Sequence, residues 1–266
     1  MIRVGIGGWF YEPWRGTFYP DGLAQSRELA YASAKLDIIE INSTYYRAQT
    51  PSTFAKWRDE TPDGFMFSVK APMFATNRKV LADVGPAVEK FASGGVAELG
   101  PKLGPIVWEF APTKQFDAAD FGAFLALLPD AIGGMPAMHV MDVRHPSFKC
   151  QAYLDLARRR GVVTVFTDAD DPASFADLTG RFVYARVKRT DARWANGFRP
   201  RDLDRLVARA RLWSEGGEPG DVPRVESVVS TKVSRRDVFM LIISGDKEKA
   251  PAAAMALKKR LGATAV

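Results

Sequence analysis

The residues that suggest chemistry most directly follow one another in one stretch, Ile38-Ile-Glu-Ile-Asn-Ser-Thr-Tyr-Tyr-Arg47. It begins with a short run of β-branched residues, typical of a fully buried parallel strand, and the carboxylate of Glu40 interrupts that run. Burying an unpaired charge is expensive, so Glu40 needs a cationic partner or a role in a site. We therefore expect the strand to deliver Glu40, Asn42, Tyr45, Tyr46 and Arg47 together to its carboxyl end.

The same pattern recurs at the other predicted strand ends, each of which carries polar or aromatic side chains. These residues are Trp9, Lys70, Glu109, Asp142, Arg144, His145, Asp168, Arg186, Lys188, Ser244 and Asp246. Parallel strands of a barrel end at one face, so convergent polar groups there predict a ligand site. For any single member, a structural ion pair at the rim is the alternative.

The segment Gly8–Pro20, directly after the first predicted strand, is rich in aromatic residues. Trp9 and Trp14 suit a stacking wall for a sugar or a base, and Arg15 suits an anionic group. A plug that packs over the barrel mouth is the alternative role. The glycines before Trp9 lack the GxGxxG spacing of a dinucleotide site.

Strand-like and helical patterns alternate along the chain. Alternation of this kind predicts an α/β fold with a parallel sheet, because parallel neighbours need crossover connections. Eight units in 266 residues favour a single-domain TIM-type (β/α) barrel over an open doubly wound sheet. The predicted strands are Ile2–Gly7, Ile38–Asn42, Phe67–Lys70, Ile106–Phe110, Met138–Val143, Val163–Thr167, Phe182–Val187 and Val238–Ile243. The predicted helices are Gln25–Lys35, Pro51–Glu60, Val84–Glu98, Asp117–Leu128, Gln151–Arg160, Pro200–Ser214 and Ala252–Leu261.

The composition is that of an ordinary globular protein, with 47% hydrophobic and 26% charged residues. No stretch approaches the apolar length of a membrane span, and we expect no membrane partner. The first strand begins at Ile2, and Cys150 is the only cysteine, so we expect a cytoplasmic protein without a signal peptide. A net charge of +6 is a mild excess that suits either solubility or an anionic partner.

Several segments, in order along nearly the whole chain, resemble the DUF72 (YecE-like) family. They are Gly7-Gly8-Trp9, Trp14-Arg15-Gly16, Glu40-Ile-Asn-Ser-Thr-Tyr-Tyr46, Thr61-Pro62-Asp63-Gly64-Phe65, Val69-Lys70-Ala71-Pro72, Leu103-Gly104-Pro105 and Arg144-His145-Pro146-Ser147. The resemblance implies a TIM barrel and a cytoplasmic protein, and it brings no established reaction. The chain departs from the family pattern at Asn77, Glu109, Asp142, Lys188 and 243–246, which indicates a divergent member.

The first functional hypothesis is a hydrolase or isomerase that binds a small anionic, phosphorylated or sugar-like ligand. Lys70, Arg144 and Arg186 would hold the anion, since guanidinium groups grip phosphate in two places. Glu40 and Asp142 are the general acid and base candidates, and His145 is a further proton-transfer candidate. The predicted ligand contacts are Trp9, Trp14, Arg15, Asn42, Tyr46, Lys70, Glu109, Arg144, Arg186 and Lys188.

Two other hypotheses belong to different classes. A metal-dependent nuclease-like or nucleic-acid-binding barrel would need metal ligands, and the chain has only His139 and His145 as imidazoles. A single Mg²⁺ on Glu40, Glu109, Asp142 or Asp168 is chemically reasonable. A non-catalytic pseudo-enzyme is the third hypothesis. The sequence identifies no cofactor, metal or oligomeric state.

Overall fold

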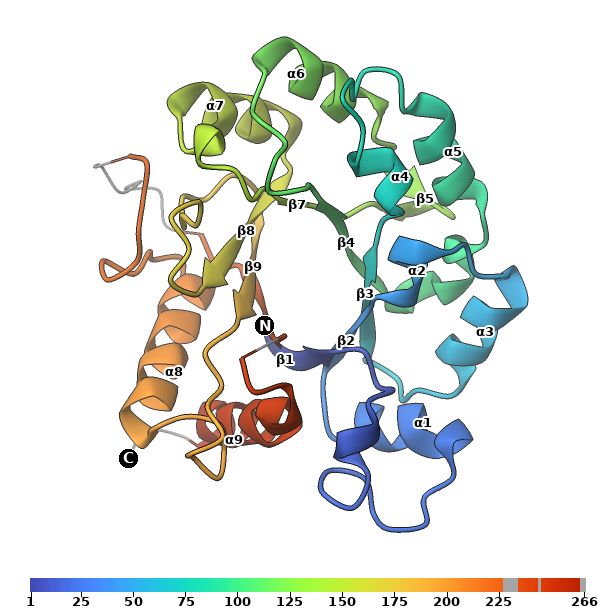
Figure 1. Ribbon diagram of the computed structural model, residues 1–266, viewed down its shortest axis with the longest axis vertical. Coiled ribbons are helices and arrows are strands. Elements are labelled where there is room, and N and C mark those ends of the chain that lie inside the picture. The colour runs from blue at the N-terminus through green and yellow to red at the C-terminus, as the bar shows by residue number, and fades with distance from the viewer. Residues whose placement is uncertain (227–233, 244, 264–266) are drawn as a thin grey trace.

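The eight apolar runs predicted as strands form a closed barrel of parallel strands in the computed structural model, which describes residues 1–226, 234–243 and 245–263. Figure 1 shows the strands as a ring with the helices around it. Around the barrel the order is β1-β10-β9-β8-β7-β4-β3-β2, and β1 pairs with both β2 and β10, which closes the ring. The prediction of a TIM-type barrel is confirmed, and the alternative of an open doubly wound sheet is wrong. The barrel strands are β1 Ile2–Gly7, β2 Ile38–Ile41, β3 Met66–Lys70, β4 Leu103–Glu109, β7 His139–Asp142, β8 Val163–Asp168, β9 Phe182–Val187 and β10 Asp237–Ile242.

The connections between the strands carry the helices. The longer ones begin with clear signals, such as Thr50, whose hydroxyl accepts from the backbone N–H of Thr53, and Asp117, which caps α6 in the same way. The α-helices are α1 Glu28–Ser33, α2 Ser43–Tyr46, α3 Pro51–Asp59, α4 Met73–Thr76, α5 Gly85–Ser93, α6 Ala118–Leu127, α7 Gln151–Arg160, α8 Pro200–Ser214 and α9 Ala250–Gly262. The 3₁₀ segments are η1 Glu12–Trp14, η2 Gln25–Arg27, η3 Val96–Lys102, η4 Pro146–Phe148 and η5 Lys247–Lys249.

One predicted helix is interrupted. The apolar spacing over Val84–Glu98 suggested one continuous helix, but α5 ends at Ser93 and η3 begins at Val96. Gly95 has a φ of 101°, which L-residues with a Cβ rarely adopt, so the helical path stops there. The hydrophobic period continues across the break because both halves pack on the same core.

Two apolar layers hold the barrel together. The larger cluster lies between strands and helices, and a smaller one is built from alternate strand residues such as Ile38, Val107, Val140, Tyr184 and Leu241. Strand side chains point alternately to the two faces of a sheet. Residues two positions further along the same strands therefore face the same side, the barrel interior, but nearer its carboxyl end.

The close approach of β1 to β2 depends on one glycine. A Cβ added to Gly5 would lie 1.7 Å from the backbone oxygen of Ile38, so no other residue fits at this point of the ring.

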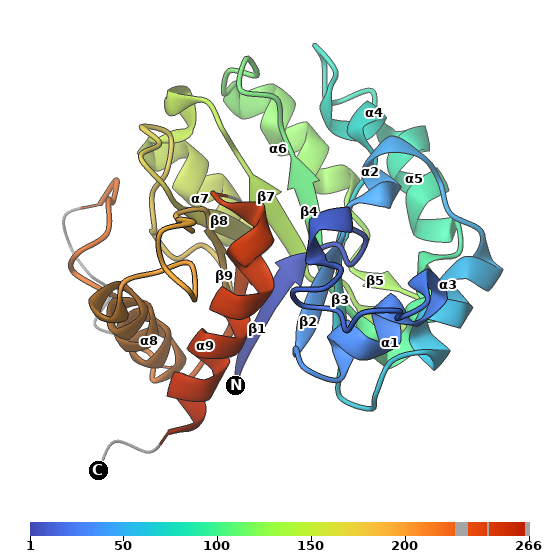
Figure 2. The same cartoon turned by 60° about the horizontal axis from the view of Figure 1, so that its bottom comes forward.

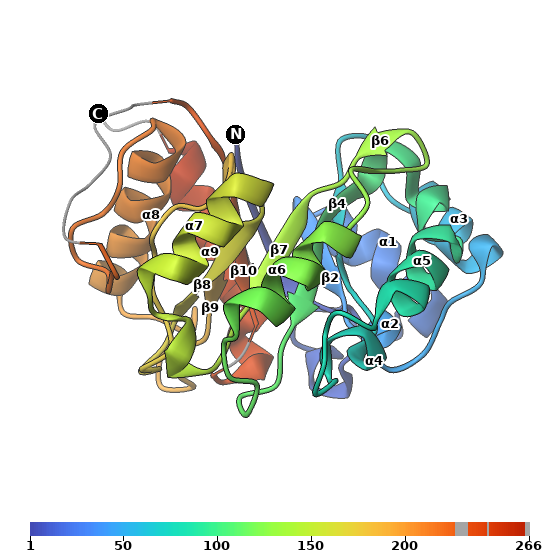
Figure 3. The same cartoon turned by 90° about the horizontal axis from the view of Figure 1, so that it is seen from above.

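The two ends of the barrel differ. Figure 2 shows the N-terminus below β1, and Figure 3 places it at the same end as the short hairpin of β5 Ala131–Ile132 and β6 Met135–Pro136, opposite α2 and α4. We call the opposite end, where the strands finish, the mouth. In the part of the chain that the structure describes, no helix has the length and apolar character needed to cross a membrane.

Candidate functional site

Arg186 lies at the centre of the mouth and is almost completely buried, at 1% exposure. Its guanidinium donates to Glu40 Oε1 at 2.6 Å and to Asp142 Oδ2 at 2.5 Å. Arg186 is on β9 and Glu40 is on β2, and β10 and β1 separate these strands in the ring. The contact therefore crosses the barrel interior, as the alternation of strand side chains requires.

A second group of charges extends this network toward solvent through Glu109. Glu109 Oε2 lies 2.5 Å from Lys70 Nζ, 2.6 Å from Arg144 Nη2 and 3.3 Å from Arg186 Nη1. Arg144 also bonds Asp142 at 2.8 Å and has 26% of its side chain exposed. We call these six residues, Glu40, Lys70, Glu109, Asp142, Arg144 and Arg186, the mouth network. The structure brings together the six sequence-predicted residues that lie on or next to strands β2, β3, β4, β7 and β9.

The electrostatics of the network favour the ionised forms of Asp142 and Glu109. Burial acts to raise the pKa of Asp142, but Arg186 and Arg144 outweigh it and hold that pKa below its usual value. Burial likewise opposes ionisation of Glu109, and the charges of Lys70 and Arg144 still leave its pKa lowered. Burial would lower the pKa of Arg186, but Glu40 and Asp142 raise it well above its ordinary value. The opposite charges of the network therefore favour the ionised forms of Asp142, Glu109 and Arg186.

Glu40 has both oxygens occupied by protein donors. Tyr184 donates its hydroxyl proton to Glu40 Oε2 at 2.8 Å, and Ser68 Oγ lies 2.8 Å from the same hydroxyl. Ser68 in turn donates to the carbonyl of Pro105 at 3.0 Å. Tyr184 was not among the predicted site residues. Its position two residues before Arg186 was the available signal.

Lys188 follows β9 two residues beyond Arg186 and is half-buried at the mouth. Within the described residues its ammonium has no carboxylate at ion-pair distance. Burial lowers the pKa of Lys188, and the nearby charge of Asp142 only partly offsets that effect. Lys188 is therefore a cation at the mouth that forms no ion pair with a carboxylate of the described residues.

The structure places the other predicted residues apart from the network. His145 Nδ1 accepts from the backbone N–H of Ser147 at 3.2 Å and so caps η4. Trp14 is buried and donates its indole N–H to the carbonyl of Lys247 at 3.0 Å. Arg15 instead pairs with the buried Glu28 at 2.8 Å. The aromatic loop is thus largely packed against the barrel.

The remaining predictions concern the rim. Asp168 is held by Arg209 at 3.3 Å, and Asp246 accepts from the backbone N–H of Glu248. Tyr46 is 75% exposed. Trp9 and Asn42 line a separate cleft, and Ser244 lies outside the described residues.

The carboxylates of the mouth network are oxygen ligands of the class that Mg²⁺ prefers. Arg186, Arg144, Lys70 and Tyr184 already donate to them, so a metal ion would have to displace these side chains. In residues 1–226, 234–243 and 245–263, no group of three or more His, Cys, Asp and Glu side chains is arranged to hold a metal. The carboxylates of the mouth network are therefore arranged to pair with side-chain cations of the protein, not with a metal ion.

Comparison with solved structures relates the whole barrel to known proteins. A DUF72 family protein from Thermotoga maritima superposes with a TM-score of 0.73 at 21% identity, covering 98% of this chain and 99% of that one. A DUF72 family protein from Enterococcus faecalis gives a TM-score of 0.72 at 15% identity, covering 100% and 97%. SacUVDE shares the fold more distantly, with a TM-score of 0.51 at 13% identity over 98% and 99% of the two chains.

Sequence comparison gives the family directly. The chain is 26% identical over 165 residues to UPF0759 protein YecE of Escherichia coli K12, which is 61% of this chain and 55% of that relative. It is 34% identical over 71 residues to UPF0759 protein YunF of Bacillus subtilis, 27% of this chain and 24% of YunF. The matches thus span about half or less of these relatives. The model of the family described as "Protein of unknown function DUF72" matches residues 3–266, so the chain belongs to that family.

Proposed function

We propose that the protein binds a small anionic ligand, phosphorylated or sugar-like, at the mouth of the barrel. The observation that carries this proposal is the unmatched charge of Lys188. Three carboxylates, Glu40, Glu109 and Asp142, face four cations, because Lys188 joins Lys70, Arg144 and Arg186. One positive charge is left over at the edge that meets solvent, and a ligand anion would neutralise it.

Unused hydrogen-bond donors support the same proposal. The Nε atoms of Arg144 and Arg186 are buried and have no acceptor among the described residues. Buried donors normally have a hydrogen-bond acceptor, because a buried donor without one costs about 1–3 kcal/mol. An anion beside Lys188 and Arg144 would supply acceptor oxygens in this region. Hydrogen bonds to charged groups are the stronger class, which suits a phosphate or a carboxylate.

Glu40 and Asp142 act in this proposal as counter-ions of Arg186. Both oxygens of Glu40 accept hydrogen bonds from Arg186 and Tyr184. Asp142 Oδ2 accepts from Arg186 and Arg144 and the pKa of Asp142 is lowered, so Asp142 has no proton to give up near neutral pH. Lys188, with its lowered pKa, is the stronger candidate for proton transfer at the mouth. Ligand binding is therefore the function proposed first, and a chemical step would follow from it.

The experiment compares Lys188→Met with Lys259→Met, a matched control at an exposed position of α9. Inorganic phosphate is titrated calorimetrically at low ionic strength. We expect the wild type and Lys259→Met to bind it, and Lys188→Met to bind it about tenfold more weakly or not at all. Equal binding by Lys188→Met, or no binding by the wild type, would refute the proposal.

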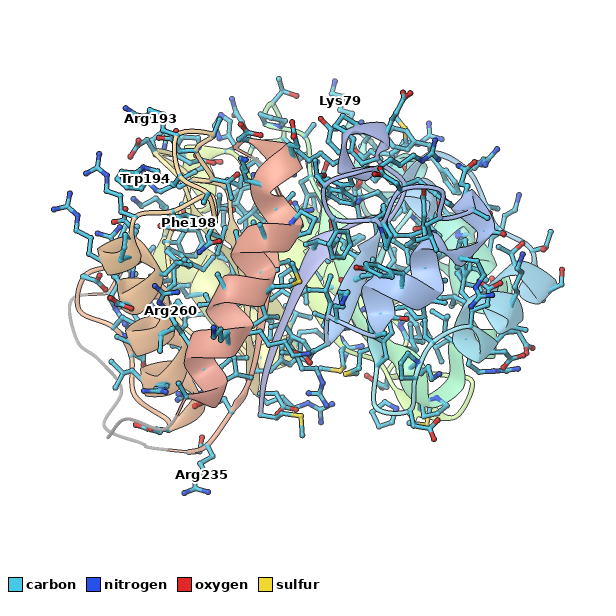
Figure 4. All side chains as sticks on the ribbon, turned by 90° about the horizontal axis from the view of Figure 1, so that it is seen from below. Lys79, Arg193, Trp194, Phe198, Arg235 and Arg260 are labelled. Atoms are coloured by element: carbon cyan, nitrogen blue, oxygen red, sulfur yellow. The ribbon has the colours of Figure 1, made fainter. Side chains whose placement is uncertain are left out.

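Nucleic acid is a second candidate ligand, favoured by the rim next to the mouth. Figure 4 shows Lys79, Arg193 and Trp194 at one end of the molecule and Arg235 at the other. Trp194 is 36% exposed and the guanidinium of Arg199 lies 5.8 Å from its ring centroid. Exposed aromatics among cations bind single strands by stacking, and such binding falls steeply with salt. A salt titration with a fluorescent oligonucleotide, with Trp194→Ala as the variant, tests this candidate.

A further inference from the structure

A second cleft lies beside the mouth network, between the segments that follow β1 and β2 and the start of η5. It encloses about 280 Å³ and is lined by Trp9, Phe10, Asn42, Arg47 and Lys247, among other residues. We call it the Trp9 cleft. Pockets for drug-sized ligands start at about 300 Å³, so this volume suits a smaller metabolite.

The cleft contains two cations that no carboxylate of the described residues neutralises. Neither Arg47 nor Lys247 has a carboxylate at ion-pair distance in the described part of the chain. Lys247 instead lies over the rings of Tyr11, at 4.4 Å, and Trp14, at 5.8 Å. Burial lowers the pKa of Lys247. Two unmatched positive charges in one cleft complement a dianion better than a monoanion.

The walls of the cleft are aromatic. Trp9 is nearly buried and packs edge-on against Trp57, with ring centroids 5.2 Å apart. Phe10 is 55% exposed and leans on Trp9 at 5.4 Å and 49°. A solvent-exposed ring at the edge of a charged cleft offers a face on which a flat ligand ring, or the apolar face of a sugar, can stack.

Polar groups without partners complete the lining. The hydroxyl of Ser43 and the amide of Gln49 make no hydrogen bond within the described residues, and Asn42 makes only a long one, 3.4 Å, to the carbonyl of Glu40. Neutral hydroxyl and amide groups of this kind recognise ring hydroxyls or ring nitrogens.

We propose that the Trp9 cleft is a binding site for a phosphomonoester carried on a ring, distinct from the anion position at Lys188. Arg47 and Lys247 hold the phosphate dianion. Phe10, supported by Trp9, stacks on the ring, and Asn42 bonds the polar substituents of the ring. Because the ring can be a sugar or a planar heterocycle, the probes below separate the two.

The test uses three probes, inorganic phosphate, glucose 6-phosphate and phenyl phosphate, titrated calorimetrically into the full chain. We expect at least one of the two ring esters to bind the wild type about tenfold or more tightly than inorganic phosphate. Tighter binding of glucose 6-phosphate assigns the cleft to sugar phosphates, and tighter binding of phenyl phosphate assigns it to aromatic ones. If neither ester outbinds inorganic phosphate, the proposal is overturned.

The variants locate the binding. Arg47→Gln should weaken the preferred ester about tenfold or more, while Arg201→Gln, a matched change at an exposed position of α8, should leave it unchanged. Phe10→Ala should reduce the affinity for the ester to that for inorganic phosphate. Arg47 is exposed and forms no ion pair with a described residue, so its variant should melt like the wild type. Unaltered ester binding by Arg47→Gln would overturn the proposal.

Lys188→Met separates this inference from the proposed function. It should abolish the binding of an anion at the mouth and leave ester binding in the Trp9 cleft within about twofold of the wild type. If Lys188→Met loses ester binding and Arg47→Gln retains it, the ester binds at the mouth and the second site is refuted.

Discussion

Replacing Arg186 by Met tests whether the protein itself supplies the counter-ion for the buried carboxylates. Arg186 is 1% exposed and bonds Glu40 and Asp142, which are 0% and 2% exposed. Removing one partner of a buried ion pair costs about 3–5 kcal/mol, because the other charge remains without compensation. For a domain somewhat larger than 200 residues, each kcal/mol lowers Tm by about 2–4 °C, so we expect a fall of about 6–20 °C.

A double-mutant cycle distinguishes ionic coupling from loss of packing. Glu40→Gln removes the charge but keeps an oxygen that accepts from Tyr184. The loss of unfolding free energy in Arg186→Met should come from uncompensated charge. The double variant Arg186→Met with Glu40→Gln should then lose about 1–3 kcal/mol less than the sum of the two single losses. Urea unfolding followed by circular dichroism gives the four free energies. A single-variant loss below about 1 kcal/mol, or strict additivity in the cycle, would refute the ionic account.

Three further outcomes follow from the structure. Gly5→Ala should abolish folding or cost about 3 kcal/mol or more, because its Cβ would lie 1.7 Å from the backbone oxygen of Ile38; circular dichroism of the purified variant checks this. Burial lowers the pKa of His139 to about 4 in the folded chain. As pH falls from about 6.5 to 4, His139 therefore binds a proton in the unfolded chain but not in the folded chain, which favours unfolding. Wild-type stability should fall in that window by about 3 kcal/mol more than that of His139→Gln, measured by urea unfolding at each pH, and parallel pH profiles would contradict this. Arg15→Gln should lower Tm by leaving the buried Glu28 unpaired, and phosphate affinity should not change.

The strands were predictable because buried parallel strands leave short apolar runs in the sequence. β1 and β9 begin and end where the sequence indicated. Charged residues at the carboxyl ends of the predicted strands, such as Glu40 and Arg186, identified groups that the structure brings together at the mouth.

Pairing between those groups could not be predicted. Arg186 and Glu40 are neighbours only because the barrel closes and brings β9 opposite β2. Arg15 lies in a loop, where no periodicity fixes the direction of a side chain, and it pairs with Glu28. Lys247 was not among the predicted residues. Arg47 was expected at the carboxyl end of its strand, but it was not assigned a ligand contact.

A crystal structure of the protein soaked in phosphate tests the central claim most directly. We expect a phosphate within hydrogen-bond distance of Lys188 Nζ, with Arg186 still bonded to Glu40 and Asp142. A mouth without phosphate at Lys188, or a phosphate that takes Arg186 away from its carboxylates, would contradict the account.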